Sequence, residues 1–189
     1  MVLTEIEMIK LHLGCGPRNF GDDWVHIDGG DYDHLDSYDI INLPVDDNSV
    51  DLIYASHVLE YFDREEAGDI LGKWFKALKA GGVLRLAVPD FHAMVRLYFE
   101  QNLPLETFLG PLYGKMKMGG ETIYHKTTYD QESLVKLLEE KVGFSETSLY
   151  NWDKTCHGDK DDHSQAYIPH MDKENGALIS LNVECKKSC

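Results

Sequence analysis

The chain has 189 residues, which is enough for a single domain (1–189) with a full hydrophobic core. Its apolar content of 43% and its charged content of 27% are typical of a globular protein. The net charge of −15 argues against nucleic acids and anionic membrane surfaces as partners, because both bind basic surfaces.

No apolar run is long enough for a transmembrane helix, which needs about 18 residues or more. Residues 1–5 lack the basic and apolar regions of a signal peptide, so we expect a cytoplasmic protein. The cysteine spacing does not indicate a disulfide framework, and in that compartment we expect free thiols. The cysteines are Cys15, Cys156, Cys185 and Cys189.

Two short apolar runs predict strands over residues 8–13 and 24–28. The first feeds a Gly14-Cys15-Gly16 turn, and the second ends on Asp28. This arrangement is typical of nucleotide-binding α/β folds, because glycines let the backbone approach a ligand and a carboxylate can bind ribose hydroxyls. The link over 16–23 has only eight residues. A parallel crossover normally needs about a dozen, with a helix among them.

The next segment predicts two strands and a helix. A short third strand is expected near residues 38–41, and the continuous apolar run at 50–55 is typical of a central strand buried on both faces. A capping-box pattern at 63–66 opens an amphipathic helix. We expect Gly81-Gly82 to end this helix with a left-handed cap.

Residues 83–88 predict another strand, and Asp90 can cap the helix that follows it. Several glycines and prolines in 103–124 indicate a lid or an insertion. A second capping-box pattern at 128–131 leads into a helix that ends at Gly143.

The C-terminal part predicts strands over residues 144–150 and 178–184. Because residues 151–176 are polar and leave no room for a helix, these two strands are expected to pair antiparallel. The polar loop is rich in groups that bind metals, but no pair has the tight spacing of a structural zinc site. We therefore expect no metal and a loop that folds over an acceptor pocket. The side chains of this loop that could in principle bind a metal are Cys156, His157, Asp159, Asp161, His163 and His170.

Taken in order, these motifs resemble the class I S-adenosylmethionine-dependent methyltransferases, in particular the small bacterial methyltransferases of type 11. The resemblance covers about residues 8–150. It implies a three-layer αβα Rossmann-like sandwich, with a mostly parallel seven-stranded sheet and a C-terminal antiparallel hairpin. The matching pieces are Leu13-Gly14-Cys15-Gly16, Ile27-Asp28, the stretch from Leu43-Pro44 to Asp51, Ser56-His57-Val58-Leu59-Glu60 and Leu78-Lys79-Ala80-Gly81-Gly82.

The resemblance implies S-adenosylmethionine as the cofactor. Asp28 would bind both ribose hydroxyls, or it would only cap a turn with Gly29-Gly30. Asp39 would contact the adenine amino group or be an ordinary loop acid, and Leu43 would pack on the adenine or belong to the core. The implied cofactor-binding residues are Gly14, Cys15, Gly16, Asp28, Asp39, Leu43, Ser56 and His57.

Three residues are candidates for handling the methyl acceptor. His57 would be a general base, because imidazole titrates near neutral pH, or it would only shape the cofactor loop. His125 is a second candidate base, the alternative being a loop histidine on the surface, and Tyr124 would orient the acceptor. Methyl transfer depends mainly on alignment, so a base is needed only where the acceptor must lose a proton.

The favoured function is methyl transfer to an O, N or C atom of a small-molecule acceptor. The alternative is a non-catalytic protein that binds S-adenosylmethionine or S-adenosylhomocysteine for regulation, because the first crossover has no room for a full helix. A nicotinamide-dependent oxidoreductase is disfavoured, since the third glycine of that fingerprint falls on Asn19 and Pro17 interrupts the turn. The sequence does not indicate the acceptor or the oligomeric state.

Overall fold

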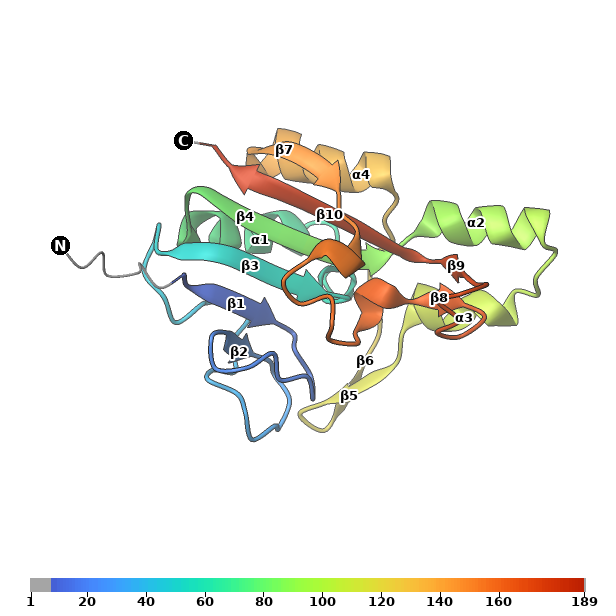
Figure 1. Cartoon of the computed structure of the whole chain (residues 1–189), viewed down its shortest axis with the longest axis horizontal. Coiled ribbons are helices and arrows are strands. Elements are labelled where there is room, and N and C mark those ends of the chain that lie inside the picture. Colours follow the sequence, from blue (N-terminus) through green and yellow to red (C-terminus); the bar gives the residue numbers. More distant parts are fainter. Residues whose placement is uncertain (1–7, 189) are drawn as a thin grey trace.

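The computed structural model describes residues 8–188 and contains one central six-stranded sheet (Figure 1). The strand order is β2 (Val25–Ile27), β1 (Lys10–Leu13), β3 (Val50–Ser56), β4 (Leu78–Pro89), β10 (Ser180–Lys187) and β7 (Phe144–Leu149). The first four of these pair in parallel, whereas β10 pairs antiparallel with both β4 and β7. The predicted α/β fold, mostly parallel with an antiparallel C-terminal pair, is confirmed.

The remaining elements connect the strands or project from the carboxyl end of the sheet. The helices are η1 (Leu59–Tyr61), α1 (Glu66–Ala77), α2 (Phe91–Glu100), α3 (Glu106–Tyr113), α4 (Gln131–Lys136), the π-helical turn η2 (Leu137–Val142), η3 (Trp152–Lys154) and η4 (His163–Gln165). Two small hairpins pair β5 (Met116–Met118) with β6 (Glu121–Ile123) and β8 (Tyr167–Ile168) with β9 (Ala177–Leu178). Within residues 8–188, no helix combines the length and apolar character that a membrane span requires.

One face of the sheet is covered by helices. Helices α1 and α4 lie behind the strands as drawn in Figure 1. Trp74 of α1 and Leu134 of α4 are fully buried there against apolar side chains such as Ile53 and Leu84. Burial of an apolar side chain contributes about 1.5–3 kcal/mol. Most of the buried apolar residues belong to the cluster between these helices and the sheet, so this layer supplies most of the core.

The opposite face is covered by irregular segments instead of a helix. The short link after β1 places Phe20 and Trp24 on Tyr54 of β3. His157 stacks on the same group, with ring centroids 5.6 Å from Phe20 and 4.0 Å from Tyr54. The third layer of the expected sandwich is therefore built from aromatic side chains of two loops, because the link is too short for a helix.

The sheet has six strands where seven were expected, because the predicted strand at 38–41 does not form. Only an isolated bridge joins Ile27 to Ser37. The Asp39 carboxylate accepts hydrogen bonds from the backbone N–H groups of Ile41 and Asn42, at 2.8 and 2.9 Å. This local turn satisfies the backbone that a strand would have paired.

Gly81-Gly82 does not end the helix as predicted. Helix α1 ends at Ala77, and Leu78 already has extended backbone. The glycines form an irregularity in β4, where the register with β3 shifts, and Gly81 has φ +76°. A side chain on Gly82 would lie 3.0 Å from the Val50 carbonyl oxygen, so the close approach of two strands explains the glycine.

The other local predictions can be checked at the helix ends. The box at 63–66 is confirmed, since Asp63 and Glu66 each accept a hydrogen bond from the backbone N–H of the other. Asp90 caps α2, also as predicted. The second box is formed by Asp130 and Ser133 rather than by residues 128–131. Residues 103–124 fold into α3 and the β5–β6 hairpin.

The predictions on residues 1–5 and on the Cys189 thiol concern parts of the chain outside the described residues 8–188. Within them, Cys15, Cys156 and Cys185 are free, as expected.

Candidate functional site

Two predicted residues, Gly14 and Asp28, follow neighbouring parallel strands at the carboxyl end of the sheet. Leu13, the last residue of β1, pairs with Ile27 of β2 and with Ala55 of β3. Gly14 and Asp28 therefore come directly after paired residues and lie together beside the end of β3. Ligands of open α/β sheets bind at this carboxyl edge.

The glycine turn has the backbone conformation that only glycine adopts easily. Gly14 has φ +65° and Gly16 has φ +56°. A Cβ on Gly14 would lie 2.2 Å from Cγ2 of Val58, whereas a Cβ on Gly16 would meet only the Arg18 guanidinium, at 3.8 Å. Between them, burial raises the pKa of the Cys15 thiol to about 12, so this thiol is a packing group.

Asp28 is buried, with 4% of its surface exposed, and it holds the turn together. Its Oδ2 accepts the Gly16 N–H at 2.8 Å, and its Oδ1 accepts the Gly30 N–H at 2.7 Å. The turn with Gly29-Gly30 is thus present, and each carboxylate oxygen keeps a second lone pair for a ligand. Met118, in the β5–β6 hairpin, lies over this turn, because a Cβ on Gly29 would be 2.9 Å from its sulfur.

The other predicted cofactor residues differ in their surroundings. Asp39 is exposed, and the hydrogen bond from the Asn42 backbone lowers the pKa of its carboxyl group. Leu43 is half-buried against the main core. The hydroxyl oxygen of Ser56, at the end of β3, is buried without a hydrogen-bond partner.

His57 follows β3 in a strained conformation, with φ +54°. Such backbone costs about 1–3 kcal/mol in a residue other than glycine and is concentrated at functional sites. Its Nε2 lies 3.2 Å from the Ser180 hydroxyl oxygen, and its Nδ1 lies 3.3 Å from Oε1 of Glu60. Burial, with His163 nearby, lowers the pKa of His57 well below its usual value.

His125 lies on the same side of the site, in the segment after β6. Its Nδ1 is 3.0 Å from the Pro111 carbonyl oxygen, and its Nε2 is 3.8 Å from Oε1 of Glu60. The side chain is only 7% exposed, so it is not a surface histidine. Burial lowers its pKa. Tyr124, by contrast, is 49% exposed.

Glu60 is the residue of this site that sequence reasoning left without a role. Its side chain is 1% exposed and lies between the two histidines, and neither carboxylate oxygen has a hydrogen-bond partner. Burial raises the pKa of Glu60 to about 8. The signal in the sequence was its spacing, three residues after His57.

The polar loop at 151–176 lies partly over the glycine turn. The Arg18 side chain donates a hydrogen bond to the Asp161 carbonyl oxygen, and His163 contacts His57 edge to face. His157 is instead buried under Phe20. Within residues 8–188, no three of the His, Cys, Asp and Glu side chains are close enough together to hold a metal ion.

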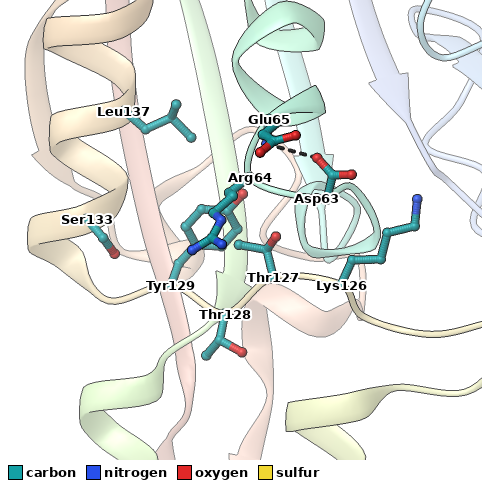
Figure 2. Close-up of a pocket in the computed structure, with 9 residues that line it drawn as sticks. All are labelled: Asp63, Arg64, Glu65, Lys126, Thr127, Thr128, Tyr129, Ser133 and Leu137. Atoms are coloured by element: carbon teal, nitrogen blue, oxygen red, sulfur yellow. Dashed lines mark hydrogen bonds between the residues drawn. The ribbon is translucent and has the colours of Figure 1, made fainter.

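An open groove of about 640 Å³ lies beside the site, between α4 and the segment that follows His125 (Figure 2). None of the predicted cofactor residues lines it, and its charges are mixed. Its lining residues are Asp63, Arg64, Glu65, Lys126, Thr127, Thr128, Tyr129, Ser133 and Leu137.

Comparison with known proteins gives a family match and a set of similar folds. Residues 28–86 match the family model described as "Methyltransferase domain". A methyltransferase from Methanosarcina mazei is 17% identical with a TM-score of 0.56, over 95% of this chain and 92% of that chain. One from Archaeoglobus fulgidus is 14% identical with a TM-score of 0.55, over 95% and 86%. Comparison with curated proteins found no match.

A third similar structure was solved with ligands. The 1,6-didemethyltoxoflavin-N1-methyltransferase of Burkholderia thailandensis holds 1,6-didemethyltoxoflavin and S-adenosylhomocysteine. It is 11% identical with a TM-score of 0.53, over 96% of this chain and 71% of that chain. At this identity the likeness shows the fold. The family match is confined to residues 28–86, and the similar folds include those of S-adenosylmethionine-dependent methyltransferases.

Proposed function

We propose that this protein binds S-adenosylmethionine at the carboxyl edge of β1, β2 and β3 and transfers its methyl group to an O, N or C atom of a small molecule. The observation that carries the proposal is Asp28, a buried carboxylate held against a glycine turn with a lone pair left on each oxygen. That donor set fits the two hydroxyls of a ribose.

The residues around Asp28 fit the rest of the cofactor. The Gly16 turn leaves open space beside its backbone, and the free hydroxyl of Ser56 can bind a polar group at the end of β3. Asp39 and Leu43 are the candidates for the adenine, and Leu43 is already half-buried. The similar Burkholderia structure, which holds S-adenosylhomocysteine, supports S-adenosylmethionine as the cofactor.

When bound, S-adenosylmethionine supplies a methyl group on a sulfonium that is already an activated leaving group. The protein then has to align the acceptor and exclude water. We call the Gly14-Cys15-Gly16 turn together with Asp28 the cofactor cradle. Met118 of the β5–β6 hairpin and the loop that carries His163 lie over its two sides and would exclude water.

His57 and His125 are the candidate bases for an acceptor that must lose a proton. Both ring nitrogens of each histidine face groups of the protein itself. A base role therefore requires one ring nitrogen to leave its present partner. Tyr124, which is half-exposed, is the candidate for orienting the acceptor.

The same observation favours a second candidate function. Because both ring nitrogens of His57 and of His125 face groups of the protein, the chain also suits a non-catalytic protein that binds S-adenosylmethionine or S-adenosylhomocysteine. A screen of methyl acceptors with labelled cofactor separates the two functions. A labelled product supports the enzyme, and binding without any product supports the regulatory protein.

Calorimetric titration with S-adenosylhomocysteine tests the binding proposal. We expect wild type to bind and Asp28→Ala to lose about 10-fold to 100-fold in affinity, because hydrogen bonds to a charged group contribute about 1.5–3 kcal/mol. Asp47→Ala, at an exposed loop position, is the control and should bind like wild type. Absence of binding to wild type would refute the proposal.

A further inference from the structure

The side chain of Glu60 joins two segments that are far apart in the sequence. Glu60 belongs to η1, directly after His57, whereas His125 follows the β5–β6 hairpin. Oε1 of Glu60 lies 3.3 Å from Nδ1 of His57 and 3.8 Å from Nε2 of His125. The protonation state of each ring follows from the partner of its other nitrogen.

For His57, a chain of hydrogen bonds determines the tautomer. The Asn182 amide donates to the Ser164 carbonyl oxygen at 2.8 Å, so its own oxygen is the acceptor that faces Ser180. The Ser180 hydroxyl donates to that oxygen at 2.9 Å. Its proton is thereby used, and it must accept from Nε2–H of His57. The lone pair of Nδ1 then faces Glu60.

For His125, the carbonyl of Pro111 determines the tautomer. A carbonyl oxygen can only accept, so Nδ1 of His125 carries the proton and donates it over 3.0 Å. In the neutral ring, Nε2 then has a lone pair, and this lone pair also faces Oε1 of Glu60. Both imidazoles therefore present acceptors to the same oxygen.

A carboxylate in this position would face two lone pairs and no donor, and it would be buried without compensation. We propose that Glu60 is a positioning residue whose neutral carboxyl group donates its one proton to the facing ring nitrogen of His57 or of His125. Without a charge on Glu60, both rings can pack against it, which keeps the segment after the hairpin at the end of β3. The inference rests on the proposed function only for its effect on cofactor binding.

The surroundings of Glu60 agree with a neutral acid. Tyr61 and Tyr129 lie near it, Asp63 lies near Tyr129, and His163 and Arg18 face the far side of His57. No Lys or Arg side chain within residues 8–188 forms an ion pair with Glu60. Burial also raises its pKa to about 8.

Through His125, Glu60 is connected to the β5–β6 hairpin, whose Met118 lies over the turn at Asp28. The ring of His125 packs on Gly114, just before β5, since a Cβ there would be 2.5 Å from Nε2. The backbone N–H groups of Lys126 and Thr127 donate to the Glu60 carbonyl oxygen at 2.8 and 3.2 Å and keep the segment attached at any pH. Ionisation of Glu60 should therefore loosen the ring and the hairpin without detaching the segment.

Glu60→Gln separates the effect of the charge from the effect of the hydrogen bonds. Its amide has two N–H groups, which suit two lone pairs at every pH. Glu60→Ala removes the donor altogether. Glu65→Gln, an exposed acid five residues later in the chain, is the matched control for the loss of one negative charge.

Nitrogen-detected NMR of the histidine rings, together with S-adenosylhomocysteine affinity from about pH 6.5 to about pH 9, tests the inference. In wild type we expect Nε2–H on His57, Nδ1–H on His125, and an affinity that falls by up to about tenfold per pH unit above the Glu60 pKa of about 8. Glu60→Gln should keep both tautomers with a flat profile, and Glu60→Ala should lose the tautomers.

Two results would overturn the inference: a charged or opposite tautomer at neutral pH in wild type, or the same pH dependence in Glu60→Gln as in wild type. Failure of wild type to bind S-adenosylhomocysteine would refute the proposed function instead. In that case the ring tautomers, read without ligand, still decide whether Glu60 donates.

Discussion

Oδ2 of Asp28 accepts a hydrogen bond from the backbone N–H of Gly16 at 2.8 Å. The carboxylate at the end of β2 therefore holds the turn that follows β1. The glycine turn and the acid are therefore one unit. A ligand that binds Asp28 meets a backbone already held in place, which lowers the entropy lost on binding.

Gly14→Ala should destabilise the protein by about 1–3 kcal/mol, because φ is left-handed and the new Cβ would overlap Val58. Thermal and urea unfolding measure the effect. Gly72→Ala in helix α1 is the control, since a Cβ there meets nothing within 4 Å and alanine should stabilise the helix by about 0.5–1 kcal/mol. Equal effects of the two variants would contradict this account of the turn.

The raised pKa of Glu60 predicts how stability depends on pH. The folded state holds a proton on Glu60 up to about pH 8, whereas the unfolded state releases it near the ordinary glutamate pKa of 4.5. Stability must therefore fall as pH rises through this window. Between pH 6.5 and 8, wild type should lose about 2 kcal/mol through this group, at 1.36 kcal/mol per pH unit.

The lowered pKa values of His57 and His125 act in the opposite direction, since both histidines bind protons in the unfolded chain below the ordinary histidine pKa of 6.5. Measurements above that pH isolate Glu60. Urea unfolding of Glu60→Gln should show a flatter profile than wild type from pH 6.5 to 8. An unchanged slope in the variant would show that another group titrates.

His157→Ala should cost about 1–3 kcal/mol, because the ring stacks on Phe20 and Tyr54 in place of a helix over that face. The fluorescence of Trp24, which contacts His157 edge to face, should shift to longer wavelength as water enters. Cys156→Ala, at the exposed neighbouring position, should change neither stability nor emission.

The hairpin that covers Asp28 should become more resistant to protease when the cradle is filled. Lys117 of β5 is exposed, and trypsin should cut there more slowly with S-adenosylhomocysteine present. Lys154, which is exposed in η3, reports general changes in cleavage. Equal protection at both sites would indicate global stabilisation rather than closure of the hairpin.

Local patterns determined much of the fold. The reciprocal bonds of Asp63 and Glu66, the cap at Asp90 and the left-handed Gly143 involve residues within a few positions of each other, so their side-chain types alone predict them. Asp28 could be assigned to the edge beside Gly14 because parallel strands end on the same side.

Tertiary structure decided the remaining features. Tyr38 to Ile41 had a strand-like pattern, yet the local turn at Asp39 satisfied the same backbone groups. The meeting of His125 with Glu60, and of His157 with Phe20, joins segments more than sixty residues apart, and no short-range pattern records such contacts. The sequence by itself determined which residue types stand at the strand ends. Only the folded chain, by burying Glu60 between two imidazoles, brought this acid into the site, because burial of a carboxyl group depends on segments distant in the sequence.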